Sequence, residues 1–429
     1  MQDNQELAPD MGGGARAAPA ADVGSGRIAS LDFIRGIAVM GILAANIVAF
    51  GQPMTAYMFP GAFTVPHSEA ENWMWVAQFV LIDGKMRGLF SLLFGAGMYL
   101  FLEKAWARGA GIWLQVQRLF WLGLFGLIHF FFIWRGDILF LYACAGLAAL
   151  LFVGLSRRKQ LVFGLLGYFG GALLYTASVG FLPLVADTDM GAQAGYAQLA
   201  NELEQSKQDE LADGRLETEL ISGGRYAEWV HHNLTAHADG LPSSLFLFWF
   251  ETLPLMLIGM AAYRYGLFDG RIASRQQRKW GWGLLLTGAV FTFPVALWAK
   301  SAGLTYYGTL AAMIGWSMGP RLLCVLGLVV LLALWGRSAG GWLAARVSAA
   351  GRAAFSNYLG TSIVMLFVFH GWAGGLFGRL GRSELYLVML AGWVLMLLWS
   401  KPWLDRYRFG PLEWLWRCLT YRRLFPMRR

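Results

Sequence analysis

Long apolar runs recur along almost the whole chain, and they constrain its fold more than any other feature. A helix needs about 20 residues to cross the hydrocarbon core of a bilayer, and backbone in lipid must satisfy its own hydrogen bonds. Ten segments fit that length, at about 30–51, 73–102, 112–134, 137–155, 161–185, 243–266, 281–300, 307–336, 353–376 and 384–401. The sequence therefore predicts an all-α, polytopic transmembrane helical bundle of about ten spans.

Composition agrees with this class and excludes others. Only 14% of the 429 residues are charged and 57% are hydrophobic, whereas a soluble protein has about 25% charged residues. The three cysteines, Cys144, Cys324 and Cys418, lie in apolar runs or near the C-terminus and offer no disulfide framework. We interpret the net charge of +9 as a sign of membrane orientation, so we expect no nucleic-acid partner.

The distribution of Lys and Arg predicts the orientation of the bundle. With ten spans both termini lie on one side, and the connections on that side hold 23 of the 35 basic residues, against 7 on the other side. Basic residues favour the cytoplasmic side. We therefore expect both the N-terminus and the C-terminus in the cytoplasm.

Five regions follow from this pattern. They are a disordered cytoplasmic tail (1–27), spans one to five (28–185), a polar periplasmic loop or cap (186–242), spans six to ten (243–402) and a cytoplasmic amphipathic tail (403–429). The tail at 1–27 is rich in Ala, Gly and Pro and lacks the features of a signal peptide. The insertion carries 11 acidic and 3 basic residues, so we expect short helices capping the bundle.

The C-terminal stretch has the pattern of an interfacial helix. Pro411 stands at a helix-start position, and Leu412, Leu415, Trp416 and Leu419 follow at the spacing of one helical face, with arginines around them. Such a helix lies on an anionic membrane surface. We expect it to anchor the tail to the lipid bilayer.

Charged groups inside the apolar run HFFFIWRGDILFLY (129–142) are the first candidates for a functional site. His129 ends the third span and Asp137 begins the fourth, so the two side chains face each other across a tight hairpin. A carboxylate there would hold the imidazole in one tautomer and prepare it as a general base. The alternative is that Asp137 only caps a helix, His129 only packs, and Arg135 is an interface charge.

Two positions on the first span form a second candidate. Asp32 and Arg35 lie on one helical face near the cytoplasmic boundary, where they form an ion pair or, alternatively, present the Arg35 guanidinium to an anionic group. Asn46 lies about three turns further along roughly the same stripe. It either bridges helices or joins a site.

A third set of charges interrupts the second span. Asp83, Lys85 and Arg87 stand among glycines at mid-depth, which suggests a broken helix that lines a polar cavity; mutual neutralisation is the alternative. Glu251 and Arg321 would form a further interhelical pair. Gly319-Pro320 is a candidate kink in the long eighth span.

The remaining histidines are weaker candidates. His370, near the periplasmic end of the ninth span, either joins His129 or is an interface residue. His231, His232 and His237 in the insertion match no zinc-ligand spacing. We interpret them as residues of a solvated loop and expect no metal site.

Three stretches together resemble a known family: RIASLDFIRGIAVMGILAANIVAFGQP (27–53), LFSLLFGAGM with RLFWLGLFGLIHFFFIWRGDILFLYACAGL (89–98 and 118–147), and GRAAFSNYLGTSIV with FGPLEWLWRCLTYRR (351–364 and 409–423). They resemble the YeiB-like family of bacterial inner-membrane proteins, also called domain of unknown function 418. The resemblance implies a multi-pass protein of the bacterial inner membrane.

The LDFIRGIAV start also resembles, more distantly, the transmembrane acyltransferase superfamily, which includes the acyltransferase-three proteins and heparan-α-glucosaminide N-acetyltransferase. The resemblance implies transfer of an acyl group across the membrane. Arg35 matches the superfamily's first-span arginine, and Asn46 stands at a position similar to an active-site asparagine. The lysosomal enzyme's histidine follows the first span, where this chain has His67, whereas His129 belongs to the YeiB-like motif. The identity of the base therefore stays open.

Two functions compete. In the first, an acyl donor, for which acyl-coenzyme A is a candidate, enters near Arg35, His129 and Asp137 deprotonate a periplasmic or lipid acceptor, and Asn46 stabilises the oxyanion. In the second, the same charges line a transport or lipid-handling pathway. A structural role without catalysis is a third alternative. The candidate substrate-binding residues are Arg35, Asp32, Lys85, Arg87, Glu251 and Arg321. The sequence does not indicate an oligomeric state.

Overall fold

The computed structural model describes residues 28–429, and apart from one isolated bridge between Tyr407 and Arg428 its regular structure is helical. The predicted tail at 1–27 lies outside the described residues. The α-helices are α1 (Ala29–Gly51), α2 (Glu69–Leu81), α3 (Lys85–Trp106), α4 (Trp113–Phe132), α5 (Leu139–Ala149), α6 (Arg157–Ser178), α7 (Leu182–Ala186), α8 (Ala197–Ser222), α9 (Tyr226–Ala236), α10 (Gly240–Arg264), α11 (Ser274–Ser301), α12 (Tyr306–Leu310), α13 (Met318–Ser338), α14 (Gly341–Arg352), α15 (Ala354–Phe369), α16 (Arg382–Arg406) and α17 (Pro411–Tyr421).

The predicted polytopic helical bundle is confirmed. Eight helical segments are long and apolar enough to cross a membrane: α1, α2 with α3, α4, α6 with α7, α10, α11, α13 and α16. A ninth arises if α14 and α15, which meet at 85°, form one broken span. The predicted fourth span corresponds to a shorter apolar helix, Leu139–Phe152. The prediction of ten spans therefore depends on how this helix and the bent pair sit in the membrane.

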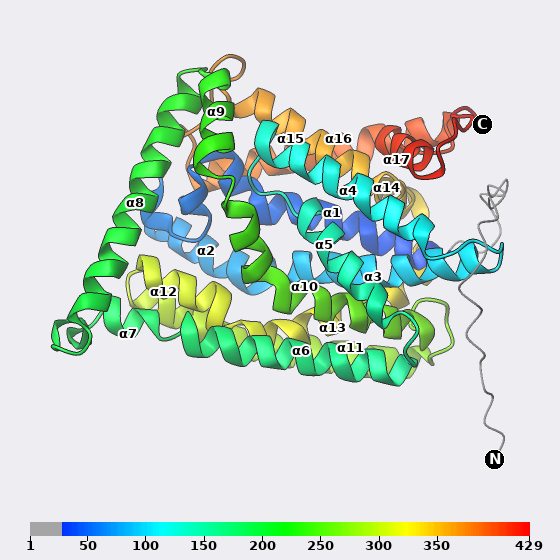
Figure 1. Cartoon of the computed structure of the whole chain (residues 1–429), viewed down its shortest axis with the longest axis horizontal. Coiled ribbons are helices and arrows are strands. Elements are labelled where there is room, and N and C mark those ends of the chain that lie inside the picture. Colours follow the sequence, from blue (N-terminus) through cyan, green and yellow to red (C-terminus); the bar gives the residue numbers. More distant parts are fainter. Residues whose placement is uncertain (1–27) are drawn as a thin grey trace.

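Most of these helices run side by side, and α8 crosses one end of them (Figure 1). We call residues 187–239 the cap and that end of the bundle the cap end. The first described turn of α1 and helix α17 lie at the other end (Figure 1). α8 has 26 residues, so it is longer than the short helices that we expected. Its sequence is rich in Ala, Leu, Glu and Gln, which favour a helix, and it buries Leu220 and Ile221.

One helix, α14, was not predicted from the sequence. We treated 337–352 as a connection, but α14 occupies most of it and packs against α1. Two glycines make this crossing close: a Cβ atom at Gly36 would collide with the carbonyl of Val347, and one at Gly351 with the carbonyl of Asp32. α14 carries too few consecutive apolar residues to be recognised as a span.

The two long predicted spans are interrupted. Between α2 and α3 the chain turns at Gly84, whose φ of 71° favours glycine. The eighth span breaks at a π-helical turn, Ala311–Trp316, so the predicted kink at Gly319-Pro320 is wrong by about one turn. Pro320 lies in the first turn of α13, where a missing N–H removes no helical hydrogen bond.

The C-terminal helix α17 joins the bundle through polar contacts as well as apolar ones. The Glu413 carboxylate accepts hydrogen bonds from the backbone N–H groups of Phe355 and Ser356 at 2.7 and 3.1 Å, at the start of α15. The Trp416 indole N–H donates to the carbonyl of Arg118 on α4 at 2.9 Å. These contacts tie the tail to two helices of the bundle.

Candidate functional site

His129 and Asp137 meet at the turn between α4 and α5, and both side chains are fully buried. His129 Nδ1 lies 2.8 Å from Asp137 Oδ1, and Asp137 Oδ2 accepts a hydrogen bond from the Phe140 N–H at 2.8 Å. Asp137 therefore makes both predicted contacts, because one oxygen accepts from the backbone at the start of α5 and the other binds the imidazole. Since the carboxylate accepts, the proton on this ring lies on Nδ1.

The hairpin needs a glycine to bring the two helices this close. A Cβ atom at Gly126 would lie 2.8 Å from Asp137 Oδ2 and would collide with the backbone nitrogen of Phe140. Gly126 is one turn before His129 on α4. The pairing of His129 and Asp137 therefore depends on this position.

Two aromatic rings cover the imidazole. The centroids of the Tyr358 and Trp134 rings lie 5.2 and 6.1 Å from that of His129, and the Tyr358 hydroxyl accepts from the Ile138 N–H at 3.3 Å. His129 Nε2 is buried and has no hydrogen-bond partner among the described residues. One nitrogen of the imidazole is therefore hydrogen-bonded, and the other is buried without a hydrogen-bond partner among the described residues.

Asn46 lies close to this pair. It lines a small cavity together with Trp134 and Tyr358, the two rings that cover His129. The space that the centre of a water molecule can occupy there is about 10 Å³, which is room for about one water molecule. α1 thus places Asn46, which was predicted as a candidate site residue, beside the rings that cover His129. Tyr358 was not named as a candidate from the sequence, although it belongs to the GRAAFSNYLGTSIV stretch that carries the family resemblance.

A second buried polar group lies inside the bundle. Glu251 on α10 pairs with Arg87 on α3 at 2.7 Å and with Arg321 on α13 at 3.0 Å. Arg321 also donates to Ser317 Oγ at 2.8 Å. The predicted pair of Glu251 and Arg321 is confirmed, and Arg87 joins it to make a three-helix ion cluster.

Lys85 and Asp83 are held by their own segment. The Lys85 ammonium donates to the carbonyl of Phe79 at 2.5 Å, near the end of α2, and Asp83 accepts from the Gln78 amide at 3.0 Å. Gln78 also accepts from Arg382 at 3.0 Å. The predicted break is present. The charges at 83, 85 and 87 make their hydrogen bonds and ion pairs with other groups, an amide for Asp83, a carbonyl for Lys85 and Glu251 for Arg87, rather than with one another.

Asp32 and Arg35 form the predicted ion pair on α1, with 3.6 Å between Oδ1 and Nη1. The Asp32 side chain is nearly buried, whereas 31% of the Arg35 side chain is exposed. Arg35 also lies against Gly97 of α3. The pair belongs to the end of the bundle opposite the cap, so it is far from His129.

The other two histidines named as candidates have different surroundings. His67 Nδ1 lies 2.9 Å from Asn72 Oδ1, and its Nε2 accepts from the Arg382 Nε–H at 3.3 Å, so neither nitrogen is open. Burial and the Arg382 charge lower the pKa of His67. His370 packs against the rings of Trp229 and Tyr226, with centroids at 5.2 and 5.9 Å, rather than against His129. His129 is the better candidate for a base.

These features define a polytopic α-helical membrane protein with a buried His–Asp pair near one end and an ion cluster inside the bundle. Comparison with known proteins identifies its family. The family described as "Protein of unknown function (DUF418)" matches residues 262–423. The chain belongs to the YeiB-like family, as its relatives show.

Relatives cover almost the whole chain. It is 31% identical over 415 residues to the uncharacterized protein YeiB of Escherichia coli, which covers 93% of this chain and 98% of YeiB. It is 30% identical over 407 residues to the uncharacterized protein YxaH of Bacillus subtilis, which covers 92% of this chain and 94% of YxaH. No solved structure matches significantly. These matches identify the YeiB-like family, but they do not include the acyltransferases that the first span resembles.

Proposed function

We propose that this protein is a membrane-bound acyltransferase that uses His129 and Asp137 as its base. The observation that carries the proposal is the buried imidazole, with Nδ1 hydrogen-bonded to Asp137 and Nε2 without a hydrogen-bond partner within residues 28–429. An unsatisfied buried polar group costs about 1–3 kcal/mol. A nitrogen kept in that state fits a role in proton transfer.

In this proposal each side chain carries one step. His129 Nε2 takes the proton of an acceptor hydroxyl or amine, and the freed oxygen or nitrogen attacks the thioester carbonyl. The C–S bond breaks, and the sulfur leaves as a thiol after taking the proton back from His129. Asp137 stabilises the imidazolium that forms between the two transfers. The Asn46 amide, which shares the cavity, supplies an N–H donor for the oxyanion.

The route of the donor follows from the orientation that we propose, with the cap in the periplasm and both termini on the cytoplasmic side of the bacterial inner membrane. α17 and the first described turn of α1 lie at the same end of the bundle, opposite the cap, which supports this arrangement (Figure 1). The anionic part of the donor binds near Arg35. Arg35 and Asn46 are eleven residues apart on α1, or about 16 Å along the helix, so the thioester must lie on a long arm.

Substrate entry requires the site to open. The cavity at Asn46 holds about one water molecule, so the rings of Tyr358 and Trp134 must move before an acyl group reaches His129. Tyr358 is on α15, which meets α14 at 85°. We propose that α15 shifts relative to the α4–α5 hairpin when substrate binds.

Thioester cleavage by purified protein tests the proposal. In proteoliposomes with radiolabelled acyl-coenzyme A, the wild-type protein should release or transfer the acyl group, and His129→Ala should slow this by about 100-fold or more, the usual contribution of a general base. His370→Ala is the matched control, because it removes another buried histidine. Equal rates in wild type and His129→Ala would overturn the assignment.

The ion cluster favours a second function, transport. Glu251 lies between Arg87 and Arg321 inside the bundle, and buried charges of this kind are typical of ion and substrate pathways. In the same vesicles, solute uptake without an acyl donor that is lost in Arg321→Gln and kept in His129→Ala would favour the transporter over the enzyme.

A further inference from the structure

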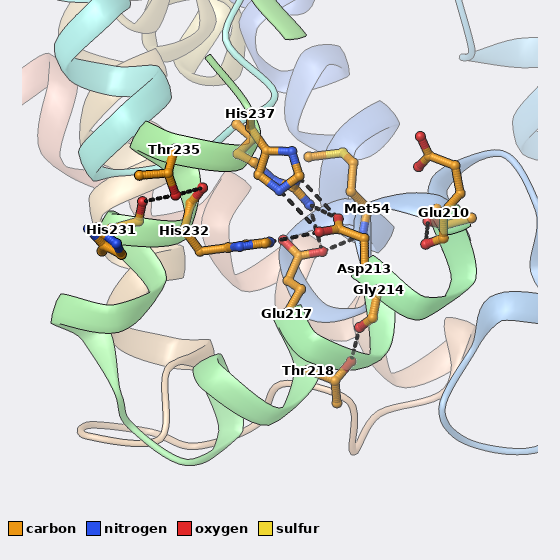
Figure 2. A network of polar contacts seen from close by, with 12 residues as sticks. Met54, Glu210, Asp213, Gly214, Glu217, Thr218, His231, His232, Thr235 and His237 are labelled. Carbon is orange, nitrogen blue, oxygen red and sulfur yellow. Dashed lines mark hydrogen bonds and ion pairs between the residues drawn. The ribbon is translucent and has the colours of Figure 1, made fainter. Parts of the chain in front are cut away.

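A cluster of side chains of the types that bind metal ions lies in the cap, and it contains none of the residues of the two sites described above (Figure 2). Asp213 on α8 lies 2.7 Å from His232 Nε2 on α9 and 3.3 Å from His237 Nε2, directly after α9. One ligand atom from each residue lies within 4.8 Å of those of the other two. Two imidazole nitrogens and a carboxylate therefore converge on one small space.

The prediction for these histidines was wrong about their structure. We interpreted His231, His232 and His237 as residues of a solvated loop, but residues 226–236 form a helix and two of the three side chains are half-buried. The third ligand-type residue, Asp213, comes from another helix, so no local spacing reveals the group. His231 is exposed, and its ring lies apart from the cluster (Figure 2).

We propose that Asp213, His232 and His237 bind a divalent transition-metal ion, with zinc as the best fit. Zinc prefers imidazole nitrogen and carboxylate oxygen in a tetrahedral arrangement, whereas calcium and magnesium prefer oxygen ligands alone. The remaining position is open to water. Glu217, one turn after Asp213 on α8, adds a second carboxylate beside the three ligands (Figure 2).

Arg135 supplies a positive charge beside the three ligand-type side chains. Its guanidinium pairs with Asp213 at 3.4 Å and with Glu217 at 3.0 Å, and it also contacts His237 Nε2. Two carboxylates, Asp213 and Glu217, therefore face one arginine. Metal binding displaces the guanidinium from His237 and Asp213, and Glu217 retains it.

The site has a structural consequence. It joins α8 to the end of α9, and through Arg135 it reaches the α4–α5 turn, two residues before Asp137. A bound ion would therefore fix the cap and change the contacts of this turn. The proposal stands without the acyltransferase, because it rests only on the cap residues and Arg135.

Metal retention by the full-length protein tests the proposal. The protein is purified in detergent without a polyhistidine tag, stripped with a chelator, dialysed against zinc and analysed by inductively coupled plasma mass spectrometry. Wild type and the control His231→Ala should each retain one zinc ion per chain, and His232→Ala, His237→Ala and Asp213→Asn should lose it. No zinc in the wild type, equal retention in all variants, or loss in His231→Ala would overturn the proposal.

A second variant separates a metal site from a simple ion-pair cluster. Arg135→Gln removes the competing cation while it leaves all three ligands, so zinc affinity measured by titration calorimetry should rise severalfold. A monodisperse peak in size-exclusion chromatography shows that the variant is folded. If folded Arg135→Gln binds zinc more weakly than the wild type, the three residues are an ion-pair cluster that needs the arginine, and the proposal is wrong.

Discussion

Asp137 carries two roles on two oxygens, and these roles can be separated. Asn is as good a helix cap as Asp, so Asp137→Asn should keep the hydrogen bond to Phe140 and change the unfolding temperature little. The amide can no longer stabilise an imidazolium at His129, so acyl transfer should fall about 100-fold or more. Thermal unfolding and the transfer rate, measured on the same sample, check this.

The control for this prediction is Asp137→Ala, which removes the cap as well. It should lose activity and also about 1 kcal/mol of stability. Full activity in Asp137→Asn would show that the carboxylate only caps α5.

The lowered pKa of His67 should make the stability of the folded protein depend on pH. In its neutral form His67 donates to Asn72 and accepts from Arg382, and its pKa in the folded protein is lowered by burial and by the Arg382 charge. The unfolded chain therefore takes up a proton first as the pH falls. Stability is full above the ordinary pKa of about 6.5 and decreases as the pH falls through the lower folded pKa.

Thermal unfolding of the wild type and His67→Gln at pH 7.5 and 5.5 measures this effect. The wild type should lose more stability between the two pH values than the variant. An equal loss in both proteins would show that other groups cause the pH dependence.

Among the elements, the α4–α5 hairpin depends on one glycine, Gly126. Gly126→Ala places a Cβ against Phe140 and Asp137, and overpacking of this kind costs about 1–3 kcal/mol. Gly123 is the matched control, because a Cβ there would meet only the Ala143 methyl at 3.3 Å and an edge of Phe140 at 4.0 Å. Unfolding in detergent should show a clearly larger loss for Gly126→Ala; equal losses would contradict the close approach at Gly126.

The joint between α15 and α17 depends on Glu413. Its carboxylate accepts the first N–H groups of α15 and the Ser356 hydroxyl. Glu413→Ala leaves these donors unpaired and should cost about 1–2 kcal/mol, as the loss of a helix cap does. Limited proteolysis should then cut the chain within 403–429 faster than in the wild type; an unchanged cleavage rate would contradict this.

Helices with a long continuous apolar run were predicted from the sequence, whereas helices whose position depends on packing against other helices were not. α1 and α10 follow from continuous apolar runs. α14 does not, because its helix is fixed by contact with α1 at Gly351 rather than by its own hydrophobicity. The break in the eighth span likewise comes from a π-helical turn at Ala311–Trp316. This turn contains no proline, so the sequence gives no local signal for it.

The candidate site was predicted where its residues are close in sequence. His129 and Asp137 are eight residues apart, so a hairpin predicts their contact. Tyr358 and Asp213 reach their partners only through the folded bundle and cap, so local spacing carries no signal for either. The pair of Glu251 and Arg321 was found because a charge in a span needs a partner.

At the scale of the whole molecule, the proposed orientation places the cap outside and the tail inside. A single cysteine at His231→Cys in the exposed cap should react with a membrane-impermeant maleimide in intact cells, after the native cysteines are replaced. One at Arg423→Cys should react only after the membrane is opened. The reverse pattern would invert the bundle.

Vectorial acyl transfer tests the central claim most directly. Sealed proteoliposomes, with the protein oriented by the cysteine assay, receive radiolabelled acyl-coenzyme A only on the side opposite the cap. We expect acylated acceptor to appear on the cap side with the wild type and to be absent with His129→Ala. Labelled acceptor in equal amounts with both proteins, or thioester cleavage that never needs His129, would contradict catalysis by the buried His129–Asp137 pair.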